Sequence, residues 1–160
     1  MPIVSNSTPL IALSRIGRLD VLRDLFEEIM VPSEVYDELV VKGKDRPGSE
    51  VIAAAGWIRR LAVQDANLAT ELRSRGLGRG EAEAVALARE TSSICLTDDL
   101  AAITAAKSLG VPVRRTLNMM VSAKAKGFVP SLREVMDALR KHSFWIDDAT
   151  YDQVLKLAGE

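Results

Sequence analysis

Short apolar runs alternate with helical stretches along nearly the whole sequence, and this alternation constrains the fold more than any other feature. Each apolar run is only a few residues long and is bounded by Gly, Pro, Asn, Asp or Ser, which is typical of buried strands that end in turns. Strands separated by helices pair in parallel and are covered on both faces. The sequence therefore predicts an α/β fold, a three-layer α/β/α arrangement with a mostly parallel central sheet.

Five apolar runs are expected to form this sheet, at residues 3–5, 29–31, 57–63, 93–96 and 111–113. The third and the last are expected at its edges, because Arg59 and Arg60 break the alternation of the one and Pro112 interrupts the other. Helices are expected between the strands and after them, at about residues 9–16, 19–26, 33–40, 47–55, 68–75, 80–88, 100–109, 116–126 and 131–141, and after residue 147.

Local signals mark two of the helix starts. Ser7 or Thr8 is expected to cap the first helix, which then opens at Pro9, and Ser131 has the capping-box spacing to Glu134. No internal repeat, low-complexity tract or linker divides the chain. We therefore expect a single domain over residues 1–160, with the C-terminal helices from about residue 131 as an appendage to it.

Composition excludes several classes of protein. The formal net charge is −1, so a nucleic-acid partner would have to be met by a local basic patch or through a metal ion. The only cysteine, Cys95, lies in an expected buried strand and is interpreted as a small core residue. No apolar stretch approaches the roughly 20 residues that span a bilayer, and the first residues lack a signal-like pattern. A cytoplasmic protein without a membrane partner is expected.

Acidic and amide side chains follow the expected strands at the point where a ligand would bind. Asn6 comes directly after the first strand, Glu38 lies in the helix after the second, Glu81 and Glu83 begin the helix at 80–88, and Asp98 and Asp99 end the strand at 93–96. Because parallel strands direct their carboxyl ends to one edge, these groups are expected to converge there. Such oxygen ligands suit Mg²⁺ or Mn²⁺, which activates water and stabilises charge on a phosphate. The residue types favour metal-assisted phosphodiester hydrolysis.

Four segments, taken in order, resemble the PIN domain, and the resemblance covers essentially the whole chain. A Phe-Trp-Ile segment at residues 144–146 is similar to the C-terminal part of one bacterial and archaeal branch of that family. The four segments are VSNSTPLI at 4–11, VPSEVYDEL at 31–39, GEAEA at 80–84 and LTDD at 96–99. The resemblance implies a Rossmann-like α/β fold and a nuclease dependent on Mg²⁺ or Mn²⁺ that acts mainly on RNA. Many such proteins are toxins of the VapC type, inhibited by an antitoxin protein and assembled as homodimers.

The resemblance also implies roles for individual residues. Glu38 and Glu81 take the places of two acidic metal ligands, and Glu83 is a near neighbour without an assigned role. Thr97 and Asp99 match a strand-ending Thr-x-Asp pattern, so Asp99 is preferred over Asp98 as the ligand, with Thr97 orienting a carboxylate. The departure is Asn6, which stands where most members have aspartate. An amide oxygen still binds a hard cation but brings no charge, so weaker metal binding is expected.

Each of these residues also has a structural explanation. Asn6 and one of the Asp98–Asp99 pair suit helix N-caps, Glu81 suits a helix N-terminus, and Glu38 suits a solvated helix face. A second hypothesis follows, in which a PIN-like module has lost catalysis and binds RNA or a protein partner. The glycine-rich segment 76–80 follows a helix and not a strand, so it does not qualify as a phosphate-binding loop, although Arg79 beside it remains a candidate phosphate contact.

Overall fold

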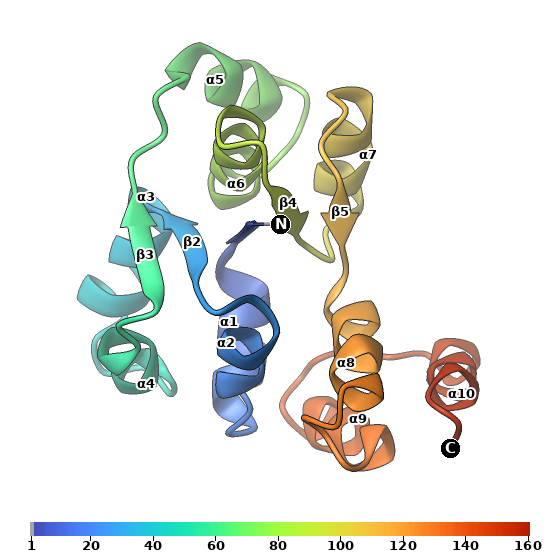
Figure 1. The fold of residues 1–160 in the computed structure, drawn as a ribbon. Coiled ribbons are helices and arrows are strands. Elements are labelled where there is room, and N and C mark those ends of the chain that lie inside the picture. The colour runs from blue at the N-terminus through green and yellow to red at the C-terminus, as the bar shows by residue number, and fades with distance from the viewer. Residues whose placement is uncertain (1) are drawn as a thin grey trace.

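The computed structural model describes residues 2–160 and confirms the predicted α/β fold (Figure 1). Five parallel strands form one sheet in the order β3-β2-β1-β4-β5. The strands are β1 (Ile3–Ser5), β2 (Ile29–Pro32), β3 (Ile58–Leu61), β4 (Ile94–Leu96) and β5 (Val113–Arg114). As predicted, the strand with Arg59 and Arg60 and the strand that follows Pro112 lie at the two edges.

Ten α-helices and one π-helix surround the sheet in residues 2–160. They are α1 (Ser7–Arg15), α2 (Asp20–Phe26), α3 (Ser33–Tyr36), the π-helix η1 (Asp37–Val41), α4 (Ser49–Ala54), α5 (Ala66–Ser74), α6 (Arg79–Glu90), α7 (Leu100–Ser108), α8 (Thr116–Ala125), α9 (Leu132–Lys141) and α10 (Asp148–Leu157). None of these helices is long and apolar enough to cross a membrane.

Alternation along the central strand explains the two helical layers. Ile3 of β1 is fully buried in one apolar cluster, which it shares with α1, α2, α4 and the C-terminal helices α8, α9 and α10. Val4, the next residue, is fully buried in the cluster formed with α5, α6 and α7 on the other face. Cys95 of β4 belongs to this second cluster, and burial raises the pKa of its thiol to about 12, as expected of a core residue.

One helix start, and the type of another helix, differ from the sequence-based expectation. The first helix begins at Ser7 and has Asn6 as its N-cap residue, so neither Ser7 nor Thr8 is the cap. The helix expected over 33–40 is α3 followed by the wider turn of η1, a change that no local residue pattern signals. The Ser131 cap is confirmed, because its side chain accepts a hydrogen bond from the backbone N–H of Glu134.

Candidate active site

Asn6 lies at the carboxyl end of the central strand and is almost completely buried, with 2% of its surface exposed. It occupies the N-cap position of α1, yet its side chain accepts no hydrogen bond from that helix. Its Oδ1 is buried without a hydrogen-bond partner among residues 2–160. A buried oxygen without a partner is costly, and capping does not supply one, so this oxygen is free to accept from a water or to bind an ion.

The helix α6 brings a second unpartnered oxygen to this part of the molecule, because it packs against both β1 and β2. Glu83 is 12% exposed, and its Oε2 is buried with no hydrogen-bond partner in the described chain. Burial raises the pKa of Glu83 above its ordinary value, Arg79 opposes this, and the charges of Glu34 and Glu38 raise the pKa further. The carboxylates of Glu34 in α3 and Glu38 in η1 therefore lie close enough to Glu83 to repel its negative charge.

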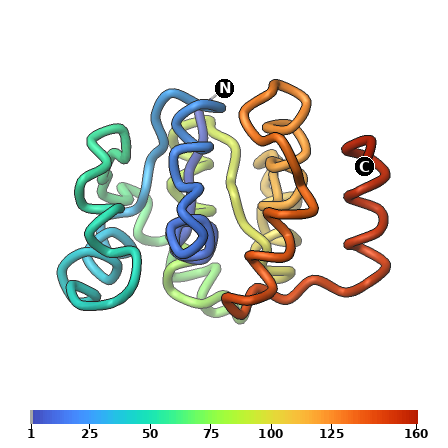
Figure 2. The backbone as a smooth tube through the Cα atoms, turned by 90° about the horizontal axis from the view of Figure 1, so that it is seen from below, coloured from blue at the N-terminus to red at the C-terminus, as the bar shows by residue number. Residues whose placement is uncertain are grey.

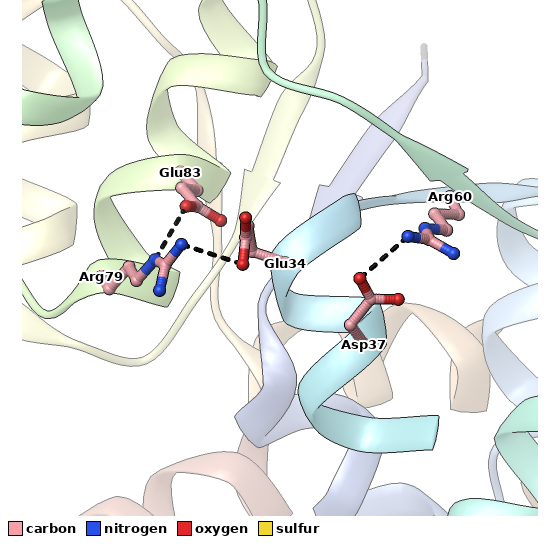
Figure 3. A network of polar contacts seen from close by, with 5 residues as sticks. All are labelled: Glu34, Asp37, Arg60, Arg79 and Glu83. Carbon is pink, nitrogen blue, oxygen red and sulfur yellow. Dashed lines mark hydrogen bonds and ion pairs between the residues drawn. The ribbon is translucent and has the colours of Figure 1, made fainter. Parts of the chain in front are cut away.

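Arg79 is the cation at the centre of this acidic group (Figure 3). Its guanidinium lies 2.9 Å from Oε2 of Glu34 and 3.3 Å from Oε1 of Glu83, and thus joins α3 to the first turns of α6. Glu34, Arg79 and Glu83 line a cavity of about 280 Å³ together with Arg73. A separate ion pair of 2.8 Å between Asp37 and Arg60 ties η1 to the edge strand.

Glu81 lies on a different side of the first turn of α6. Its Oε2 occupies the space that a Cβ atom at Gly78 would need, so the side chain folds back over the N-cap residue of its own helix. This is the placement expected of a carboxylate at a helix N-terminus. The residue that the structure brings near Glu34 and Glu38 is Glu83.

The acidic pair after β4 supports two different helices. Asp99 is the N-cap of α7 and accepts a hydrogen bond of 2.9 Å from the N–H of Ala102 through Oδ2. Asp98 accepts from both the backbone N–H and the hydroxyl of Thr116 and so holds the start of α8. The hydroxyl oxygen of Thr97 accepts a hydrogen bond of 3.2 Å from the backbone N–H of Asp99 and so orients the main chain at this turn.

The sequence matches the family model of the PIN domain over residues 2–160. The chain belongs to the PIN domain family. No curated protein matches the sequence. PIN domains are generally nucleases, and they usually use divalent metal ions.

The donors of this PIN domain suit such an ion in kind, although they are not gathered into a closed cluster. No three His, Cys, Asp or Glu side chains within residues 2–160 form a group that could hold a metal ion. Mg²⁺ is commonly held by one or two carboxylates and keeps several waters, so a closed set of acids is not required. Two buried oxygens without partners, on Asn6 and Glu83, are the structural sign that fits a hard cation.

Sequence reasoning found the strand ends of this PIN domain and missed the contacts between helices. Asn6, Asp98 and Asp99 stand where a parallel sheet places ligand-binding groups. The bridge from Glu34 through Arg79 to Glu83 was missed, because its members come from two helices separated by more than 40 residues of sequence. The glycines before α6 indicate a tight entry to that helix, but nothing in them indicates which carboxylates Arg79 contacts.

Proposed function

We propose that this PIN domain is an endoribonuclease dependent on Mg²⁺ or Mn²⁺ that hydrolyses RNA phosphodiester bonds. The single observation that carries the proposal is the buried, unpartnered Oδ1 of Asn6 at the carboxyl end of β1. Family membership supports it, because PIN domains are generally nucleases. The larger proposal includes a role as the toxin of a type II toxin–antitoxin pair, a homodimeric state, an antitoxin partner and a cytoplasmic location.

The proposed metal ligands are Asn6, Glu38, Glu81 and Asp99, with Glu83 added by its position in the structure. Asp99 is preferred over Asp98 because Oδ1 of Asp99 makes no hydrogen bond within residues 2–160, whereas both oxygens of Asp98 are bound to Thr116. When bound, the ion would lower the pKa of a coordinated water and stabilise charge on the phosphate.

The chain itself would supply proton transfer and phosphate contacts. Burial raises the pKa of Glu83 above its ordinary value, so Glu83 would move a proton only if it is not bound to the ion. Arg79 and Arg73, which border the same cavity, would contact phosphate oxygens. Asn6 would bind the ion through a neutral oxygen. The site would therefore carry one negative charge less than a site with aspartate at this position.

The test is cleavage of a mixed RNA pool by the purified protein with Mn²⁺, with a chelator, and with two matched variants. Asp99→Asn keeps an N-cap of nearly equal quality, so the protein stays folded while a ligand charge is lost. Asp65→Asn makes the same change at the N-cap of α5, where Asp65 accepts from Leu68 at 3.0 Å. We expect metal-dependent cleavage by the intact protein and by Asp65→Asn, and none by Asp99→Asn.

A second candidate function is a PIN module that binds RNA or a protein partner without cleaving. Asn6 in place of an aspartate favours it, as does the engagement of Asp98 and Asp99 in helix caps. Folded protein that binds the RNA pool and leaves it intact with Mn²⁺ would support this candidate. Cleavage that persists in chelator, or in Asp99→Asn, would contradict the metal-dependent mechanism.

A further inference from the structure

A groove of about 540 Å³ lies between α8, the segment 143–147 and α10, beside the start of α1. Figure 2 shows α10 standing at the side of the molecule, outside the layer that α8 and α9 form. Asp98 and Thr8 line the groove, so it opens next to the carboxyl end of the sheet where the candidate active site lies. The volume is in the range of about 300–1,000 Å³ that small-ligand sites occupy.

Trp145 is the most exposed large apolar residue in the groove, with 83% of its surface accessible. Its backbone is nevertheless anchored. The next residue, Ile146, is buried, and its carbonyl oxygen accepts hydrogen bonds of 3.1 and 2.7 Å from Nε and Nη2 of Arg140. An indole exposed on an anchored backbone is an available stacking surface, and its exposure does not come from a loose chain end.

Three polar side chains of the groove match the remaining parts of a nucleotide, and the carboxylates Asp98 and Asp147 also line it. Arg115 is half exposed and lies 3.6 Å from Asp98, so a cation stands between the groove and the end of β4. Asn118 and Gln153 are exposed amides that both donate and accept hydrogen bonds, which is what the edge of a base requires. A purely apolar partner would leave these three side chains without use.

We propose that this groove binds one unpaired nucleotide of RNA, with its base stacked on Trp145 and its phosphate at Arg115. The RNA class of the ligand rests on the proposed function, and the groove is a site separate from the metal ligands. Stacking on an aromatic side chain tolerates any base, so the subsite selects unpaired RNA and not a sequence. A paired base would be unable to reach the indole, which makes single-stranded RNA the expected substrate.

The test measures binding of a short, unstructured, fluorescein-labelled oligoribonucleotide in chelator, so that no cleavage interferes. We expect Trp145→Leu to bind about tenfold more weakly, since stacking contributes about 1–3 kcal/mol per base, and Trp145→Phe to bind nearly as the intact protein does. Leu keeps an apolar side chain but removes the π-face, whereas Phe keeps the π-face. In a Trp57→Phe background Trp145 is the only tryptophan, and its fluorescence is expected to be quenched by the RNA.

The outcomes separate this inference from the proposed function. If the intact protein binds RNA but Trp145→Leu binds equally well and Trp145 is not quenched, the groove is not the nucleotide site, and the ribonuclease proposal stands. If the intact protein binds no RNA in chelator, the inference is overturned, and the ribonuclease proposal is decided separately by the cleavage assay with Mn²⁺. If Trp145→Leu leaves RNA binding unchanged and converts a dimer to a monomer in sedimentation, the groove is a contact between copies of the chain and the inference is wrong.

Discussion

At the scale of single residues, Asn6 is expected to set how strongly the proposed site attracts a cation. We expect Asn6→Asp to lower the stability of the metal-free protein by about 1–3 kcal/mol, because it places a charge in a buried position without a partner. With Mn²⁺ the same variant should gain more thermal stability than the intact protein does, since the added charge strengthens binding to the folded state. Thermal melting with chelator and with Mn²⁺ measures both effects.

Asn67→Asp is the matched control for that change, because Asn67 is exposed in the first turn of α5. It should leave the melting temperature nearly unchanged and independent of the metal. A metal-free Asn6→Asp protein as stable as the intact one would contradict the burial argument. If Mn²⁺ raised the melting temperature of Asn6→Asp and of the intact protein equally, Asn6 would be removed from the proposed ligand set.

Glu83 should give the protein a pH dependence that a glutamine lacks. Its folded-state pKa lies above the ordinary value of 4.5, chiefly because of burial. The folded protein therefore holds this proton more tightly than the unfolded chain, and the stability associated with it is present below pH 4.5 and lost as the pH rises through the raised pKa.

Relative to the intact protein, Glu83→Gln should thus become more stable as the pH rises from about 4.5 to 7. Arg79 keeps its ion pair with Glu34 in this variant. Thermal melts over a pH series provide the measurement, and Glu71→Gln, on an exposed ion pair with Arg75, is the control that should show little change. A stability difference for Glu83→Gln that does not vary with pH would contradict the expectation.

The positions of candidate site residues were predictable from sequence only where they follow the end of a strand. Asn6 follows β1 directly and Asp99 lies in the short turn after β4, so their location needs only the order of elements. The capping of α8 by Asp98 joins positions 98 and 116, which are brought together by the β4–α7–β5 crossover. No local pattern contains such a pair, because it depends on how the crossover folds back.

At the scale of elements, the π-helix η1 is a conformation that helix propensity does not predict. Its turn carries Glu38 and closes against Gly43, where an added Cβ would lie 2.7 Å from the carbonyl oxygen of Leu39 and 2.8 Å from that of Glu38. A glycine at this position is required by a close backbone approach. Residues 33–40 have the sequence pattern of an ordinary α-helix. Helix propensity depends on side chains, so it does not predict a turn that is set by close packing of one backbone segment on another.

Gly43→Ala is therefore expected to destabilise the protein by about 1–3 kcal/mol, the usual cost of forcing atoms into an occupied space. It should also shift the turn that holds Glu38 and weaken any Mn²⁺-induced stabilisation. Gly56→Ala is the matched control, because no atom lies within 4 Å of the place that an added Cβ would take there. Urea unfolding measures the difference, and equal stability of the two variants would show that η1 tolerates a side chain.

At the scale of the whole molecule, the C-terminal helices are expected to unfold together with the sheet. Leu139 of α9 is fully buried in the cluster that also contains Ile3 of β1, whereas the buried Cys95 belongs to the cluster on the opposite face. Because β1 supplies neighbouring residues to both clusters, a substitution that destabilises one cluster should also destabilise the other. The expectation of a single domain over residues 1–160 can therefore be tested by a substitution on one face of the sheet and a measurement on the other.

We expect Leu139→Ala to lower the free energy of unfolding by about 2–5 kcal/mol, through lost burial and the cavity left behind. Cys95 reports the effect, since its thiol is buried with a pKa of about 12 and becomes reactive only when the chain opens. In urea, the midpoint for thiol labelling should fall together with the midpoint for Trp57 fluorescence in a Trp145→Phe background. If Leu139→Ala left the Cys95 midpoint unchanged, α9 and α10 would be a separately unfolding appendage, because a shared core transmits the loss to both faces of the sheet.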